Sequence, residues 1–150
     1  MKKRVGIIGA TGMVGQRFIT LLENHPYFEI TVLAASSRSA GKTYAEVMEN
    51  RWKMSAPIPE EYKNIKITDA QKIDEIAPLV DFVFCAVDMK KDEIKALEES
   101  YAKAEIPVVS NNSASIQRGL SAASLLLVEI FAVGTNVPNG VPLPVVKRTI

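Results

Sequence analysis

Near the amino terminus, residues 5–18 read V-G-I-I-G-A-T-G-M-V-G-Q-R-F. The apolar run over residues 5–8 predicts a buried strand that ends at Gly9. Apolar residues then recur at helical spacing over residues 14–23, which predicts a helix. The turn between them, residues 9–15, has the pattern G-x-x-G-x-x-G. A strand before this pattern and a helix after it are the context in which it binds a dinucleotide.

Each glycine of this loop has a physical role in that interpretation. Gly9 allows the tight turn, Gly12 leaves backbone N–H groups open to a pyrophosphate, and Gly15 lets the helix pack closely on the strand. The helix N-terminus adds oriented N–H donors and the positive end of the helix dipole, and Thr11 offers a hydroxyl. The alternative is a glycine-rich turn without a ligand, but the flanking strand and helix both favour dinucleotide binding.

Strands and helices alternate along the rest of the chain, which predicts an α/β fold of the Rossmann type: a doubly wound, mostly parallel sheet with helices on both faces. We expect strands at residues 5–8, 29–35, 65–68, 81–87 and 107–110, and helices at residues 14–23, 44–50, 72–77, 90–103 and 115–132. Pro57 and Pro59 predict irregular chain between two of these elements.

The expected domain organisation follows from the same pattern. One dinucleotide-binding domain is predicted over residues 1–132, with residues 1–114 as its N-terminal part and residues 115–132 as a closing helix. Residues 133–150 contain prolines and glycines without periodicity and are expected to form a loosely ordered tail.

The residues after the second expected strand decide which dinucleotide is favoured. NAD-binding folds of this type place a carboxylate there, about 20 residues past the loop, to bind the ribose 2′-hydroxyl. Here residues 33–38 read L-A-A-S-S-R, and the next carboxylate is Glu46. Where the carboxylate would stand, the chain instead has hydroxyl groups and two cations, on Ser36, Ser37, Arg38, Ser39 and Lys42. A 2′-phosphate needs such a set, so NADP is favoured over NAD; a solvated polar loop is the alternative.

Composition narrows the classes of partner. The 150 residues suggest one domain, and 47% hydrophobic with 23% charged residues is ordinary for a soluble globular protein. A net charge of +1 provides no broad field that would attract nucleic acid or a membrane. No stretch approaches the ~20 apolar residues that span a bilayer. Cys85 is the one cysteine, so no internal disulfide can form. We therefore expect a cytoplasmic protein.

The groups that could carry covalent catalysis are unfavourably placed. Cys85 lies inside the apolar run D-F-V-F-C-A-V, where burial should make the thiol inert, so we interpret it as a core residue. His25 precedes Pro26 at the far end of the first helix and is interpreted as a loop residue rather than a base. A packing role is favoured for Trp52. One cysteine and one histidine cannot supply a structural zinc site, and we predict no catalytic residue and no metal.

Taken together, these motifs show that the chain resembles aspartate-semialdehyde dehydrogenase of the archaeal and fungal type. The matching pieces are residues 5–18, L-A-A-S-S-R-S-A-G-K at 33–42, R-W-K-M at 51–54 and V-V-S-N-N-S-A at 108–114. The resemblance implies an oxidoreductase of amino-acid biosynthesis, which reduces aspartyl phosphate to the semialdehyde, or runs that reaction in reverse, with NADP.

The resemblance also implies which residues contact NADP. Those implied to meet the pyrophosphate are Gly9, Thr11, Gly12, Met13 and Val14. Those implied to meet the adenosine ribose and its 2′-phosphate are Ser36, Arg38 and Ser39. The remaining two are Ala86, beside the cofactor, and Asn111, near its nicotinamide end.

The match breaks after residue 114. In the family a catalytic domain is inserted there, with a nucleophilic cysteine, a histidine base and substrate arginines. Here residues 115–132 follow at once and resemble the family's last helix. The chain therefore resembles a two-domain enzyme with its middle removed, through a truncated gene, a natural deletion or engineering. We expect NADP binding without turnover, unless a separate chain supplies the catalytic half.

Two other functions stay open at this point. The chain could belong to a malonyl-CoA reductase-like enzyme, because substrate choice would be made by the missing part. It could also be a non-catalytic, NADP-responsive module that recruits a partner through its apolar last helix. An uncovered apolar helix favours association, so we expect a homo-oligomer.

Overall fold

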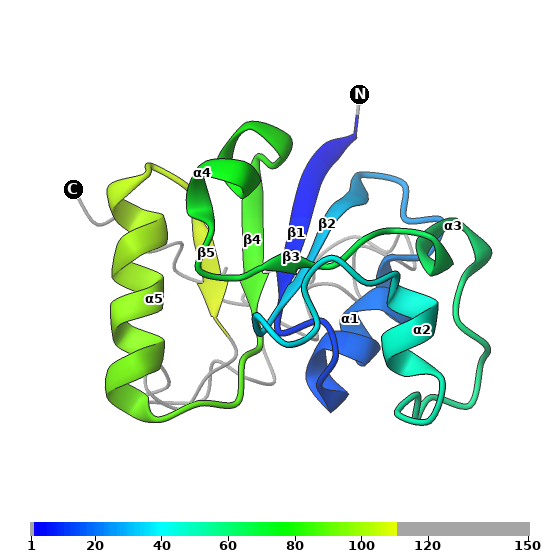
Figure 1. Cartoon of the computed structure of the whole chain (residues 1–150). Helices are drawn as coiled ribbons and strands as arrows, with labels where there is room; N and C mark the ends of the chain where they lie inside the picture. The colour runs from blue at the N-terminus through cyan, green and yellow to red at the C-terminus, as the bar shows by residue number, and fades with distance from the viewer. Residues whose placement is uncertain (1, 111–150) are drawn as a thin grey trace, which may run out of the picture.

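Residues 2–110, the part of the chain that the computed structural model describes, form a parallel sheet in the order β3-β2-β1-β4-β5 (Figure 1). The strands are β1 (Lys3–Ile8), β2 (Phe28–Ala35), β3 (Thr68–Asp69), β4 (Phe82–Cys85) and β5 (Val108–Ser110). The helices are α1 (Met13–Leu22), α2 (Tyr44–Met48), α3 (Glu60–Lys63), α4 (Ile73–Ile76) and α5 (Lys91–Lys103), with a 3₁₀ turn η1 (Ala77–Leu79). The predicted Rossmann-type fold is confirmed.

Helices cover both faces of the sheet, and each face has its own apolar core. Under α1 and α2 the core includes Phe18, Ile19, Tyr44, Ile7 and Leu33. Under α4 and α5 it includes Ile76, Leu97, Tyr101, Ile8 and Ala34. Successive side chains of a strand point to opposite faces, so Ile7 and Ile8 are both fully buried, each in a different core. This two-sided burial explains why the strands are continuous apolar runs.

Two predicted strands differ from expectation for identifiable reasons, and the strand predicted over residues 107–110 begins one residue later, at Val108. The strand predicted over residues 81–87 ends at Cys85, where the backbone of Ala86 comes close to Gly9. The strand predicted over residues 65–68 is reduced to the two residues of β3. Residues just before β3 pair instead with the loop after β2, since Lys66 bridges Thr43 in antiparallel fashion.

The helix predictions differ in smaller ways. The short helix expected over residues 44–50 ends at Met48. Residues 60–63 form α3, which was not predicted; it begins directly after Pro59, and the two prolines do precede it in irregular chain. The closing helix expected over residues 115–132 and the tail over 133–150 lie outside the described residues.

A buried histidine stabilises the turn between α1 and β2 through hydrogen bonds and ring stacking. The imidazole Nδ1 of His25 accepts hydrogen bonds from the backbone N–H groups of Tyr27, at 3.1 Å, and Phe28, at 3.2 Å. Its ring stacks on that of Phe28 with 4.8 Å between centroids. Burial, with a smaller effect of the Lys2 charge, lowers the pKa of His25. The ring is therefore neutral with its proton on Nε2, and its interpretation as a loop residue is confirmed.

We expect the free energy of unfolding to fall as the pH drops below about 6.5, the ordinary pKa of histidine. Between that value and the lowered pKa of His25 in the folded chain, the unfolded chain binds more protons, so stability rises with pH. Urea denaturation at about pH 7.5 and about pH 5.5 measures the slope. His25 is the one histidine of the chain, so His25→Gln removes this titration and should flatten the pH dependence. An equally steep dependence in the variant would contradict the assignment.

Candidate nucleotide-binding site

The glycine loop joins β1 to α1 at the carboxyl edge of the sheet. Gly9 has φ +87°, a left-handed conformation that other residues rarely adopt. The N–H groups of Gly9 and Ala10 both donate to the carbonyl oxygen of Ala34 on β2, at 2.9 and 3.0 Å. The N–H of Gly12 donates back to the carbonyl of Gly9 at 3.2 Å. Backbone hydrogen bonds therefore fix the loop against the strand ends.

The glycines of the loop differ in what a side chain would meet. A Cβ at Gly15 would lie 2.2 Å from the carbonyl oxygen of Gly9, and a Cβ at Gly9 would lie 2.6 Å from the carbonyl oxygen of Ala86. A Cβ at Gly12 would have the Gly9 oxygen, at 3.6 Å, as its neighbour among the described residues. Close backbone packing thus requires glycine at positions 9 and 15, whereas a methyl group at position 12 would make only an ordinary van der Waals contact with the described residues.

The start of α1 lies next to Gly12 and carries N–H donors that are unpaired within the helix. The N-cap residue is Gly12, which has no side chain to accept a hydrogen bond from the helix. The first N–H groups of a helix, here those of Met13 and Val14, have no partner within it. No acidic residue occupies the first turn, so no side-chain charge there offsets the positive end of the helix dipole. The arrangement suits an anion.

The loop after β2 lies beside the glycine loop, because the parallel pairing of β1 with β2 continues up to Ile8 and Ala34. Ser39 donates its N–H to the carbonyl of Ser36 at 3.0 Å, and Gly41 donates to the carbonyl of Ile67 at 2.8 Å. Ser39 is buried, whereas Arg38 is exposed. The turn therefore anchors Ser39 and leaves the guanidinium of Arg38 accessible at the same edge.

A tyrosine joins α2 to the glycine loop. The buried hydroxyl of Tyr44 donates to the carbonyl of Ala10 at 2.8 Å, and burial raises the pKa of Tyr44, so it remains a donor. At the start of α2, the N–H and the hydroxyl of Thr43 both donate to Glu46 at 2.8 Å. These hydrogen bonds lower the pKa of the Glu46 carboxyl. The first carboxylate after β2 is thus engaged in a helix cap.

Comparison with known proteins identifies the family. The semialdehyde dehydrogenase, NAD-binding domain family matches residues 4–141. This chain belongs to that family. It is 46% identical over 111 residues to the aspartate-semialdehyde dehydrogenase of Schizosaccharomyces pombe, covering 73% of this chain and 29% of that protein. The enzyme of the same name from Methanothermobacter thermautotrophicus is 45% identical over 112 residues, covering 73% and 30%.

A solved structure agrees with these relatives. The crystal structure of aspartate-semialdehyde dehydrogenase with NADP from Candida albicans superposes with a TM-score of 0.67 at 41% identity, covering 75% of this chain and 30% of that one. The chain therefore spans about three tenths of the length of the relatives it matches. The resemblance noted from the sequence motifs is confirmed.

The structure of this semialdehyde dehydrogenase NAD-binding domain brings the predicted residues that it describes to one edge. The glycine loop and the start of α1 carry Gly9, Thr11, Gly12, Met13 and Val14. The loop after β2 carries Ser36, Arg38 and Ser39. Ala86 follows β4 and donates its N–H to the carbonyl of Ile8 at 2.8 Å. Asn111 lies outside the described residues. The contacts of all ten residues with a cofactor stay predictions.

Two residues of the site were not found by sequence reasoning. Tyr44 and Gln16 both hydrogen-bond to carbonyl groups of the loop. Gln16 could have been noticed as an amide that lies on the predicted first helix next to its apolar residues. Tyr44 could have been noticed because it directly follows a threonine that can cap a helix. Trp52 has the predicted packing role: its indole N–H donates to Ala56, and its ring meets the Tyr44 ring edge-on at 6.4 Å.

The one thiol and the one imidazole of the chain lie at opposite edges of the sheet. Cys85 is buried at the carboxyl end of β4, in register with Ile8, and belongs to the core under α5 as predicted. His25 precedes the amino end of β2, which begins opposite Lys3. Residues 2–110 hold no group of three metal-ligating side chains, and no helix among them is long and apolar enough to cross a membrane.

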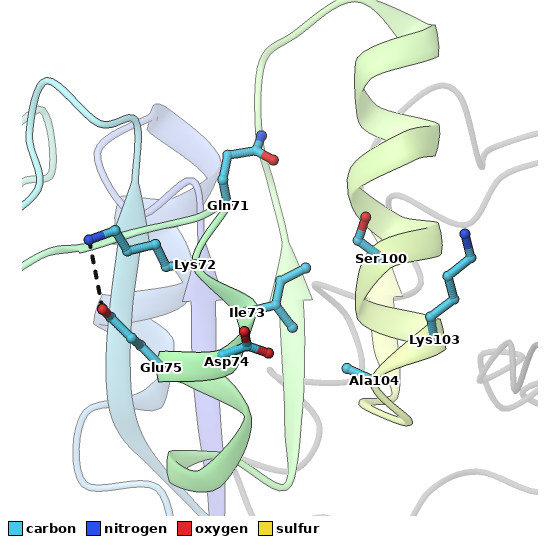
Figure 2. Close-up of a pocket in the computed structure, with 8 residues that line it drawn as sticks. All are labelled: Gln71, Lys72, Ile73, Asp74, Glu75, Ser100, Lys103 and Ala104. Carbon is cyan, nitrogen blue, oxygen red and sulfur yellow. Dashed lines mark ion pairs between the residues drawn. The ribbon is translucent and has the colours of Figure 1, made fainter.

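A hollow of about 610 Å³ on the surface lies elsewhere, between α4 and the end of α5 (Figure 2). It is lined by residues 71–75 with Ser100, Lys103 and Ala104. Its charges are mixed, and Lys72 pairs with Glu75 at 3.7 Å. Since α5 starts after the carboxyl end of β4, its last turn lies toward the opposite edge. The glycine loop, and not this hollow, has the features of a phosphate site.

Substitutions at two glycines should separate packing from ligand contact. Gly15→Ala should lower the free energy of unfolding by about 1–3 kcal/mol, because the added methyl collides with the Gly9 carbonyl. Gly12→Ala should change it by less than about 1 kcal/mol. The same methyl at position 12 should weaken NADPH binding at least about tenfold, because it occupies the space in front of the loop.

Urea denaturation measures the stability of both variants, and titration followed by NADPH fluorescence measures the affinity. A folded Gly12→Ala chain that bound NADPH as tightly as the wild type would contradict the placement of the pyrophosphate in front of Gly12.

Proposed function

We propose that this chain binds NADP through its glycine loop and forms the cofactor-binding part of an aspartate-semialdehyde dehydrogenase-type reductase. The observation that carries the proposal is the room that residues 2–110 leave at Gly12, next to the N–H groups of Met13 and Val14, which have no partner within α1. A diphosphate fits that set of donors, because it is small, doubly charged and able to accept several hydrogen bonds. The relative from Candida albicans, solved with NADP, supports it.

The preference for NADP over NAD follows from the loop after β2. A ribose 2′-hydroxyl would require a carboxylate at the end of β2, but β2 ends at Ala35 and the Glu46 carboxyl is bonded to Thr43. Arg38 is exposed at that edge instead, and Ser36 and Ser39 flank it. A guanidinium with neighbouring hydroxyl or N–H donors suits a phosphate dianion.

The reaction itself is proposed from the relatives. The bound nicotinamide would supply or accept the hydride, and the residues described here would bind and orient the dinucleotide. A thiolate and a base that act together are needed to form and release an acyl intermediate, and Cys85 and His25 are too far apart in the fold for that. Binding without turnover by these residues, a cytoplasmic location and association of copies through residues 115–132 stay predictions.

We expect Arg38→Ala to weaken NADPH binding about 10–100-fold, the effect of losing charge-assisted hydrogen bonds to a phosphate. NADH lacks that phosphate, so its affinity should change less than about twofold. Fluorescence titrations of the wild type and the variant with both nucleotides measure the difference.

Lys103→Ala is the matched control, because it removes an exposed cation from the hollow between α4 and α5. It should bind both nucleotides like the wild type. Equal affinities of the wild type for NADPH and NADH would remove the case for phosphate recognition by Arg38.

A further inference from the structure

A buried amide lies directly behind the glycine loop. Gln16 is on the first turns of α1, and its side chain is 2% exposed. Its Nε2 donates to the carbonyl of Thr11 at 3.1 Å and to the carbonyl of Arg51 at 3.2 Å. Its Oε1 accepts the backbone N–H of Lys53 at 2.8 Å. The side chain therefore joins the loop to a segment 35 and 37 residues away in the sequence.

The contact with Thr11 fixes the orientation of one peptide group. The carbonyl of Thr11 and the N–H of Gly12 belong to the same planar unit. Gln16 holds the carbonyl end, and the carbonyl of Gly9 holds the N–H end at 3.2 Å. With both ends held, the peptide cannot rotate, and the N–H groups that follow it at the start of α1 are presented in one direction.

The contacts with residues 51–53 keep a basic segment beside the loop. Arg51 and Lys53 are both exposed, and Gln16 ties their backbone to the start of α1. The Arg51 charge also acts on the pKa of Tyr44, which it lowers against the larger raising effect of burial. Tyr44 itself donates to Ala10 of the loop. The hydrogen bond from Gln16 to the Arg51 carbonyl is thus the contact that places Arg51 near the phosphate loop.

We propose that Gln16 is a positioning residue: a clamp that holds the glycine loop in its anion-binding shape and keeps the basic segment 51–53 next to it. The inference rests on the proposed function, in which that loop binds the pyrophosphate of NADP. The clamp needs an amide, because one end must donate two hydrogen bonds while the other accepts one. Neither a carboxylate nor a thioether of similar length can do both.

Two variants of Gln16 test the clamp. Gln16→Met keeps the length and loses all three hydrogen bonds, so NADPH should bind at least about tenfold more weakly. Gln16→Glu keeps the acceptor for Lys53 but turns a carboxylate toward two carbonyl oxygens. Its affinity should be low at neutral pH and recover as the carboxyl is protonated, because the acid O–H can then donate to one carbonyl.

Each affinity is divided by that of the wild type at the same pH, since the 2′-phosphate of NADPH itself titrates near pH 6. Gln71→Met is the matched control: the same change at an exposed glutamine that lines the hollow between α4 and α5 (Figure 2). It should leave the NADPH affinity unchanged at every pH.

Hydrogen exchange in the free chain tests the clamp without any ligand. The Lys53 amide should be protected in the wild type and in Gln16→Glu, and should exchange faster in Gln16→Met. A folded Gln16→Met chain that binds NADPH with wild-type affinity would overturn the proposal. A Gln16→Glu chain whose affinity relative to the wild type does not change with pH would also overturn it. A wild type that fails to bind NADPH while Lys53 stays protected would instead refute the proposed function.

Discussion

The close approach of α1 to the end of β1 is the constraint on which the rest of the site depends. The backbone at Gly15 lies so near the Gly9 carbonyl that a methyl group would be 2.2 Å from its oxygen. The chain must therefore leave β1 through a glycine in the left-handed conformation and begin α1 within four residues. That path ends with helix N–H groups facing open space, which is the physical origin of the proposed phosphate site.

Such a loop holds its shape because its polar groups are bonded from several directions. The carbonyl of Ala34 on β2 accepts hydrogen bonds from two N–H groups of the loop. Tyr44 donates a hydrogen bond to the loop from α2, and Gln16 donates one from α1. Hydrogen bonds from several neighbours favour one conformation. A loop shaped before the ligand arrives loses less conformational freedom on binding, so these three contacts favour affinity as well as stability.

Local signals predicted most of the fold, and distant pairings account for what they missed. The glycine spacing and the apolar runs sufficed for β1, α1, β2, β4 and α5, because each depends on its own residues. The shortness of β3 did not follow from its sequence, since Lys66 pairs with Thr43 across the loop. Most of the predicted site residues came from the glycine loop and the loop after β2. Gln16 was missed because its partners at Arg51 and Lys53 are brought close only by folding.

Backbone amides of the glycine loop are proposed to bind a diphosphate. The most direct test follows the ¹H–¹⁵N amide signals of the chain while NADPH is added. The largest shifts are expected at Met13 and Val14, with smaller shifts at Gly12, whose N–H already donates to Gly9, and at Arg38, and none at the hollow lined by residues 71–75. Shifts centred on that hollow, with the loop amides unmoved, would contradict the proposal.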